Sequence, residues 1–424
     1  MAGRVASHAR AGGAVLAVLL AGASAPAAAQ EDPLVRTATR QCADRDGMAK
    51  SSCYEQILLP LAERGELGRA LRVLEQIGAI DQEVRRNGHM YVHGLGIAAY
   101  DPARDAAETF TECTELFHAG CYHGVIQAHF SGLAVIDSIA VNDFCGRVRE
   151  RRPDQWTYFQ CVHGLGHGLT INAAHDLPAG LAGCDLLAGI WEQESCYGGA
   201  FMENVGNATQ PHHNALVATL PAADPGGGGG GHAGHGQHAA QTSFKPIDPD
   251  DPHHPCSVVG EQYVAACYGM QTTVMLHLNG NDFGKAARTC DSAPPAARRT
   301  CHQSLGRDAS GFAEQDHQDT IRLCRKDESP NGVWCYVGAV KAITDWSGTP
   351  DEGHGFCARV ERGPARVRCI EALGEQIGIM MGTPEARRAA CLAGDATLSD
   401  VCLYGARVLA VKPAALRALD ADGR

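Results

Sequence analysis

Apolar positions in the second half of the chain recur in short blocks that are separated by polar turns. In residues 319–346, apolar side chains at helical spacing precede Cys324 and follow Cys335, and the residues between them are charged or turn-forming, including Pro330 and Gly332. This pattern predicts two antiparallel helices joined by a short turn. One cysteine lies near the end of the first helix and the other near the start of the second, where a disulfide can join them.

The same block recurs about every 34 residues, as the first cysteine of each of the last five blocks shows: Cys256, Cys290, Cys324, Cys357 and Cys391. The pattern continues with looser spacing in the N-terminal half, where one unit around Tyr91 has no cysteine. We therefore predict an all-α fold, a right-handed α-solenoid of about ten helix-turn-helix repeats.

All eighteen cysteines fall into neighbouring pairs, and none forms a Cys-x-x-Cys motif. The even count and the spacing predict nine disulfides within repeats rather than a metal-thiolate or redox site. A closed loop of about a dozen residues stabilises each hairpin by roughly 2–3 kcal/mol. The predicted pairs are Cys42–Cys53, Cys113–Cys121, Cys145–Cys161, Cys184–Cys196, Cys256–Cys267, Cys290–Cys301, Cys324–Cys335, Cys357–Cys369 and Cys391–Cys402.

The chain divides into four segments. Residues 1–30 combine Arg4 and Arg10 with a short apolar run and a small-residue end, which predicts a signal peptide and export to the periplasm or the extracellular space. No later apolar run is long enough to suggest direct membrane insertion. A Gly/His/Pro-rich segment, residues 204–255, is predicted to be a flexible insertion between the repeats of residues 31–203 and those of residues 256–424.

The repeat length and the hairpin layout resemble those of the tetratricopeptide (TPR) and Sel1-like helical-repeat proteins, over nearly all of the chain after residue 30. The likeness is one of period and layout, because the Trp, Leu-Gly, Tyr, Ala and Pro signature of the tetratricopeptide repeat is absent. A stack of such hairpins presents a long concave surface, so a protein or peptide partner is the expectation.

A small residue stands three positions after the second cysteine in most units. A helical glycine costs roughly 1 kcal/mol, so its recurrence indicates a packing role, and we expect it to face the first helix of its own hairpin. The residues in this position are Gly124, Gly164, Gly199, Ser304, Gly338, Ala372 and Gly405, with Gly94 as the equivalent in the unit without cysteines.

Histidine occupies the position two residues after the second cysteine, or its equivalent, in three successive N-terminal units: His93, His123 and His163. His167 follows His163 by one helical turn, and two imidazoles at this spacing are a common way to hold Zn²⁺ or Cu²⁺. Glu203 is a weaker candidate for a carboxylate ligand, since its position points nearer to the disulfide side. Two alternatives stay open: a hydrogen-bonded histidine ladder between repeats, or a distorted turn caused by the glycines around His167.

The insertion adds further histidines, among them His232, His235 and His238, which follow or flank the glycine run of residues 226–231. One interpretation is an auxiliary metal-collecting loop that supplies the histidine site. The other is a tolerated low-complexity loop in which the histidines have no role.

Charge and motifs narrow the function classes. The net charge of −12 disfavours nucleic acid as a partner, and the chain has no haem-attachment motif, phosphate-binding loop or serine-hydrolase elbow. We predict an exported helical-repeat binding or scaffold protein with a histidine-lined metal site and with neither haem nor nucleotide. The alternatives are a secreted or periplasmic metalloenzyme centred on the His-Gly-x-Gly-His segment, residues 163–167, and a purely structural repeat protein.

Overall fold

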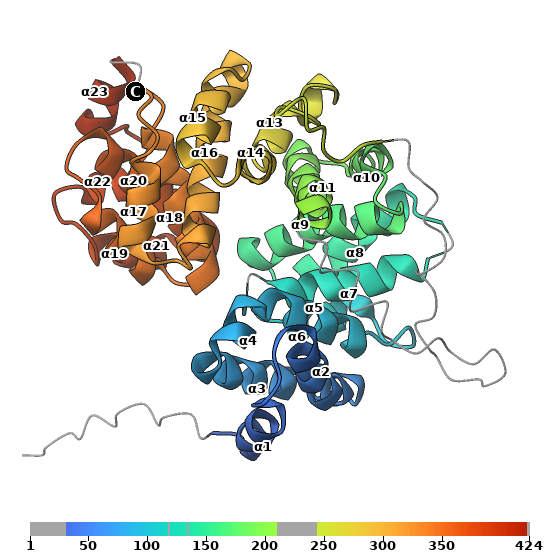
Figure 1. Ribbon diagram of the computed structural model, residues 1–424. Coiled ribbons are helices and arrows are strands. Elements are labelled where there is room, and N and C mark those ends of the chain that lie inside the picture. The colour runs from blue at the N-terminus through green and yellow to red at the C-terminus, as the bar shows by residue number, and fades with distance from the viewer. Residues whose placement is uncertain (1–30, 118, 134, 210–243, 422–424) are drawn as a thin grey trace, which may run out of the picture.

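The computed structural model describes residues 31–117, 119–133, 135–209 and 244–421. In these ranges the protein is all-helical, with 22 α-helices, one 3₁₀ helix and no strand (Figure 1). The predicted signal peptide, residues 1–30, lies outside the described residues. Within the described ranges, none of the helices has the length and apolar character needed to cross a lipid bilayer.

The first half of the molecule contains eleven helices, which run from blue to green in Figure 1. They are α1 (Pro33–Cys42), α2 (Gly47–Glu63), α3 (Leu67–Ile80), α4 (Gln82–Arg86), α5 (Gly88–Ala99), α6 (Ala106–Glu112), α7 (Gly120–Ser131), α8 (Ser138–Arg151), α9 (Gln155–Asn172), α10 (Leu177–Cys184) and α11 (Ile190–Thr209). Aspartate caps begin several of them: the Asp105, Asp137, Asp154 and Asp176 carboxylates each accept a backbone N–H of the first turn.

The second half runs from yellow to red. It holds η1 (Glu261–Tyr263), α13 (Val264–Tyr268), α14 (Gln271–Asn279), α15 (Phe283–Asp291), α16 (Pro295–Phe312), α17 (His317–Cys324), α18 (Val333–Ser347), α19 (Pro350–Arg359), α20 (Pro364–Met380), α21 (Pro384–Leu392), α22 (Ser399–Gly405) and α23 (Ala414–Ala421).

Nine disulfides join the cysteines in the predicted pairs. Their Cα–Cα distances lie between 5.5 and 5.9 Å, the spacing of two helices that meet at a tight turn. In seven pairs the bridge joins a residue at or near the end of one helix to the next helix, as between Cys324 of α17 and Cys335 of α18. The bridge Cys145–Cys161 joins the middle of α8 to the middle of α9. Each bridge therefore fixes one hairpin.

The unit closed by Cys256 and Cys267 departs from the predicted hairpin. Residues 244–260 form turns and bends in place of a first helix. Prolines at positions 246, 249, 252 and 255 explain the difference, because each lacks an N–H donor and disfavours the helical conformation of the residue before it. Helix α11 continues to Thr209 and so includes residues 204–209 at the start of the predicted insertion.

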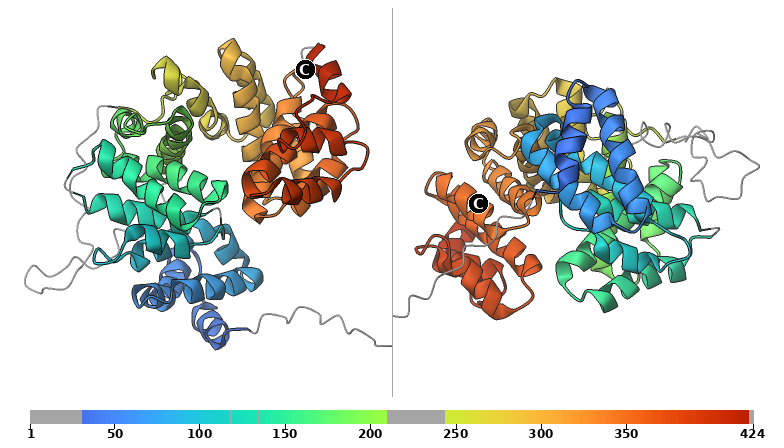
Figure 2. Two further views of the ribbon diagram at one scale, coloured as in Figure 1. Left: turned by 180° about the vertical axis from the view of Figure 1, so that it is seen from behind. Right: turned by 90° about the horizontal axis from the view of Figure 1, so that it is seen from below.

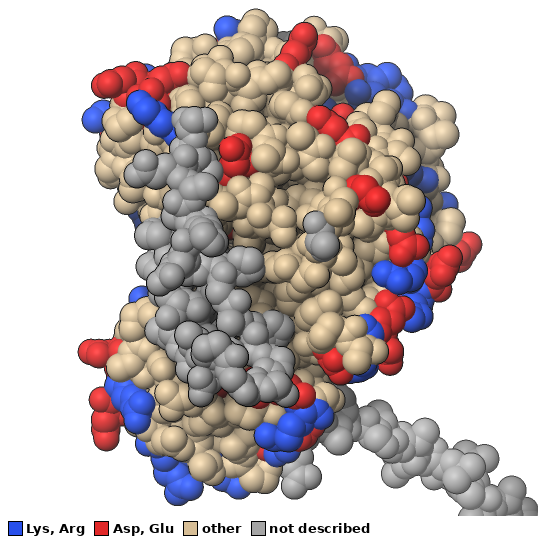
Figure 3. All heavy atoms as spheres, turned by 90° about the vertical axis from the view of Figure 1, so that its right-hand side faces the viewer, with Lys and Arg blue, Asp and Glu red and all other residues tan. Residues whose placement is uncertain are grey.

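The chain bends back on itself between its two halves (Figures 1 and 2). Helix α20 contacts α9, and the Gln82 side-chain amide donates to Glu314 across 3.5 Å, so segments far apart in sequence meet. On the face in Figure 3, acidic and basic side chains are interspersed and no extended basic field is visible.

The second helices of the hairpins lie beside one another and form the main packing contacts of the fold. In the first half these helices are α5, α7, α9 and α11, and in the second half they are α16, α18, α20 and α22. The small residue three positions after the second cysteine lies in these contacts, and the expectation that it faces the first helix of its own hairpin is wrong. A Cβ on Gly199 would overlap the carbonyl oxygen of His163 on α9, and a Cβ on Gly338 would overlap that of Gln303 on α16.

A second glycine completes each of these contacts from the opposite side. Gly166 and Gly306 stand five positions after Cys161 and Cys301, and their Cβ atoms would overlap the carbonyl oxygens of Cys196 and Cys335. Reciprocal glycines of this kind join α5 to α7, α9 to α11, α16 to α18 and α20 to α22. The helix pairs therefore approach backbone to backbone, and this close contact recurs at every second junction within each half.

We predict that Gly306→Ala lowers the free energy of unfolding by roughly 3 kcal/mol or more, because the added methyl group must separate two backbones. Gly311 lies in the same helix, and a Cβ there would meet no neighbouring group within 4 Å, so Gly311→Ala should stabilise the protein by up to about 1 kcal/mol. Chemical denaturation of the two variants measures both effects. Equal stabilities would contradict the proposed role of Gly306.

A candidate metal centre between α7 and α9

Helix α9 is regular through the glycine-rich segment, so the distorted-turn alternative is wrong. Each glycine of this segment accommodates a neighbouring helix: a Cβ on Gly164 or Gly168 would overlap the side chain of Ile126 on α7, and Gly166 meets α11. Because α9 is held on both sides, the side chains of His163 and His167 have a fixed direction relative to α7.

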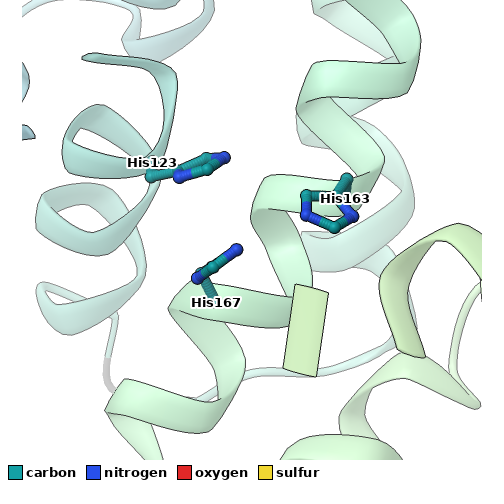
Figure 4. A group of neighbouring side chains, drawn as sticks. All are labelled: His123, His163 and His167. Carbon is teal, nitrogen blue, oxygen red and sulfur yellow. The ribbon is translucent and has the colours of Figure 1, made fainter. Parts of the chain in front are cut away.

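Three histidines meet where α7 and α9 pack. His123 from α7 and His163 and His167 from α9 each offer one ligand atom, and these atoms all lie within 4.8 Å of one another. Figure 4 shows the three rings turned toward one space. The ring centroids are separated by 4.3 Å between His123 and His167, 5.3 Å between His163 and His167, and 6.0 Å between His123 and His163.

Helix α11 supplies the outer partners of two of these rings. The Nδ1 atom of His163 lies 3.2 Å from the carbonyl oxygen of Ser195, and Nδ1 of His167 lies 3.0 Å from Oε2 of Glu203. Both partners accept hydrogen bonds, so each Nδ1 is assigned as the protonated nitrogen and Nε2 carries the lone pair. Metal-binding histidines usually have this arrangement, in which an outer acceptor fixes the ring and its tautomer.

The structure places Glu203 behind His167 rather than among the three grouped ligands. Its carboxylate is buried, and Oε1 lies 3.5 Å from Nδ1 of His175. The sequence placed the Glu203 side chain by its angle around the helix axis relative to the disulfide. That angle does not show that the side chain meets His167 on the neighbouring helix. Ser195, Gly199 and Glu203 are spaced by four residues on one face of α11, and this face meets α9.

His123 is the least satisfied member of the group. Its side chain is 4% exposed, and neither ring nitrogen has a hydrogen-bond partner among the described residues. The buried His302 shows how this chain treats such a ring elsewhere: its two nitrogens lie 2.5 Å from Asp327 and 3.2 Å from Asp291. A buried polar group left without a partner costs about 1–3 kcal/mol, so the environment of His123 favours a ligand.

The site favours neutral imidazoles, the form that binds metal ions. Burial lowers the pKa of His123 well below its usual range, and the neighbouring histidines, His167 first, lower it further. Burial and His167 together lower the pKa of His163 to about 3.

His93, the fourth predicted ligand in this set of histidines, lies outside the group of three. It is buried on α5, and its ring lies against that of His89, with centroids 6.4 Å apart. His89 in turn lies 5.5 Å from His123, and its Nδ1 is 3.0 Å from the carbonyl oxygen of Phe117. The sequence pattern assigned no role to His89, although its spacing of four residues from His93 repeats that of His163 and His167.

The histidines of the predicted metal-collecting loop, His232, His235 and His238, lie outside the described residues. Two histidines at the end of the insertion are described and have local partners. His253 contacts the Ser292 hydroxyl at 3.0 Å and the Tyr268 hydroxyl at 2.9 Å, and His254 donates to the Lys245 carbonyl oxygen at 2.6 Å. His253 therefore contacts α13 and the end of α15, whereas His254 is held within residues 244–255.

The equivalent positions in the second half have different chemistry. Gln303, Val337 and Glu371 stand two residues after their cysteines and line a pocket of about 320 Å³ together with Trp334. Arg299 lies over the Trp334 ring at 4.0 Å from its centroid. The same backbone position thus carries imidazoles in three units of the first half and lines a charged, aromatic pocket in the second.

No family model, curated protein or solved structure matches this chain. The function must therefore be inferred from the site itself.

Acidification should destabilise the metal-free protein partly through His163. An unfolded histidine takes up a proton below about pH 6.5, whereas folded His163 stays neutral down to about pH 3. The unfolded state then binds more protons, so the free energy of unfolding falls as the pH falls through this window. We expect a smaller fall in His163→Gln than in the native chain when chelator-treated proteins are unfolded in denaturant at about pH 7 and about pH 5.

Comparing the native chain with His163→Gln separates the effect of His163 from that of carboxyl groups, which change the stability in the opposite direction. Burial raises the pKa of Glu55 and of Asp345 to about 7, so these carboxyls stabilise the folded state on acidification in both chains. An identical pH dependence in the two chains would contradict the prediction.

Proposed function

We propose that this protein binds a transition-metal ion of the Zn²⁺ or Cu²⁺ class at His123, His163 and His167, on an exported and disulfide-stapled helical-repeat scaffold. The observation that carries the proposal is the unsatisfied His123 ring, buried beside two histidines whose Nδ1 atoms already have acceptors. An ion among the three rings would give His123 the partner it lacks.

The spacing of the ligand atoms supports this assignment. Two nitrogens that bind one Zn²⁺ ion at about 2.0–2.1 Å are roughly 3.4 Å apart in tetrahedral geometry. The three candidate nitrogen atoms lie within 4.8 Å of one another. Rotation of the rings that moves these atoms by about 1 Å would bring them to coordination distance. Imidazole nitrogens without thiolates suit borderline ions such as Zn²⁺ and Cu²⁺.

The hydrogen-bonded histidine ladder has less support. Such a ladder requires each buried ring to donate to or accept from its neighbour, and His123 makes no hydrogen bond to any described residue. The rings contact one another as aromatic groups instead, with His123 and His167 stacked at 19° between their planes.

Export and a scaffold role form part of the same proposal. Disulfides persist in oxidising compartments, and nine of them are consistent with a protein of the periplasm or the cell exterior. The likeness to tetratricopeptide and Sel1-like repeats and the pocket beside Trp334 support a protein or peptide partner for the second half.

A metalloenzyme is the second candidate. Three histidine ligands from the described residues leave a fourth position for water or substrate, the arrangement of catalytic rather than structural zinc sites. A water molecule there would become a hydroxide nucleophile near neutral pH.

Elemental analysis of protein purified without chelator tests the metal site. We expect metal in stoichiometric amount in the native chain and its loss in His163→Ala/His167→Ala, because two of three ligands are removed. The control His253→Ala/His254→Ala removes two histidines with local partners and should retain the metal. Native protein that takes up neither Zn²⁺ nor Cu²⁺ on dialysis would refute the proposal.

Glu203→Gln should weaken metal affinity by about 10- to 100-fold while leaving the stoichiometry unchanged, because Glu203 orients His167 and raises its basicity. Competition titration with a chromogenic chelator measures the affinity. Glu192 lies on the same helix and accepts a hydrogen bond from Tyr158, so Glu192→Gln is the matched control and should bind metal like the native chain. Equal affinities for all three proteins would remove Glu203 from the site.

A further inference from the structure

Five histidines form a continuous row across α5, α7 and α9. His89 and His93 are one helical turn apart on α5, as His163 and His167 are on α9, and His123 of α7 lies between the two pairs. The row therefore has a pair at each end and a single ring at its centre.

At the α5 end, as at the α9 end, an oxygen acceptor lies beside a histidine Nδ1 atom. Nδ1 of His89 lies 3.0 Å from the Phe117 carbonyl oxygen, which assigns the proton to Nδ1 and the lone pair to Nε2, as in His163 and His167. The ring also has a dedicated space, since a Cβ on Gly120 would lie 3.0 Å from its Nδ1 and 2.7 Å from the carbonyl oxygen of His89.

One metal ion does not satisfy the central ring. His123 has two buried nitrogens without a partner, and an ion held with His163 and His167 would engage only one of them. The other nitrogen would still lack a partner among the described residues, in a side chain that is 4% exposed. On the α5 side, the described histidine His89 lies beside it, with the ring centroids 5.5 Å apart.

We propose that a second transition-metal ion binds on the α5 side of His123, held by His89 and His93, and that the His123 imidazole bridges the two ions through its two nitrogens. This inference rests on the proposed function, because the bridge requires the first ion. It divides the predicted histidine set into two adjoining positions that share His123.

The ring spacings on the α5 side fit a second ion. With a metal–nitrogen distance of about 2.1 Å, the centroids of two imidazoles on one ion are roughly 4.5–6.4 Å apart for angles between about 90° and 180°. The centroid separations of 5.5 Å between His89 and His123 and 6.4 Å between His89 and His93 fall in this range. The latter lies at its upper limit, so we expect the second ion to bind more weakly than the first.

Bridging also has a defined proton balance. The neutral His123 ring carries one N–H and one lone pair, and the first ion takes the lone pair. Binding of the second ion replaces the N–H proton, which leaves to solvent, and the ring becomes an imidazolate with a metal–nitrogen bond at each nitrogen. No electron transfer is involved.

Titration of the chelator-stripped, full-length exported chain with Cu²⁺ tests the inference. We expect two bound ions per chain by elemental analysis after gel filtration, and one in His89→Ala/His93→Ala. Two Cu²⁺ ions joined by an imidazolate couple magnetically, so the electron paramagnetic resonance signal should rise with the first equivalent and fall with the second. The same titration of a variant with His232, His235 and His238 replaced by alanine shows how many of the bound ions belong to the insertion.

The outcomes separate the inference from the proposed function. One ion in both the native chain and His89→Ala/His93→Ala, with a signal that never falls, would overturn the second position and leave the first intact. No tightly bound ion in the native chain would overturn both. The magnetic readout uses the native chain, so it decides the question even where the double variant fails to fold.

Discussion

The close contact between second helices, in which glycines replace side chains, is the constraint on which the rest of the structure depends. Gly166 and Gly199 let α9 and α11 touch backbone to backbone. Only at this separation can the Ser195 carbonyl group and the Glu203 carboxylate reach the rings of His163 and His167. A side chain in the contact would move α11 outward and would break both hydrogen bonds.

Disulfides and glycines stabilise different levels of the fold. Each disulfide closes a short loop and restrains one hairpin, mainly by limiting its unfolded conformations. A bridge such as Cys145–Cys161 does not set the distance between neighbouring hairpins. That distance comes from the glycine contacts, which alternate with junctions filled by larger side chains such as Ile126, between Gly164 and Gly168. The histidine group lies at one of these wider junctions, where there is room for imidazole rings.

Local features could be predicted from the sequence, and contacts between hairpins could not. Cysteine spacing indicated the hairpins and the disulfides because both ends of each bridge lie within 16 residues. The face shared by His123 and His163 followed from their common position after the cysteine, and that of His167 from its place one helical turn after His163. The partners of Gly199 and Glu203 were missed. The angular position of a residue relative to the cysteine of its helix does not show which neighbouring helix that face meets. Prolines in residues 244–260 also prevented the first helix that the repeat pattern predicted, and the sequence already contained this signal.

The two halves show how one backbone plan can hold two chemistries. The contacts of α9 with α11 and of α16 with α18 use glycines at matching positions, so the side chains two residues after the cysteines are presented in similar surroundings. In three units of the first half those side chains are imidazoles, and in the second half Gln303, Val337 and Glu371 line a pocket with Trp334. A rigid repeated contact fixes the position, and the residue placed there decides the chemistry. The proposed metal site therefore belongs to the first half through its histidines and not through its fold.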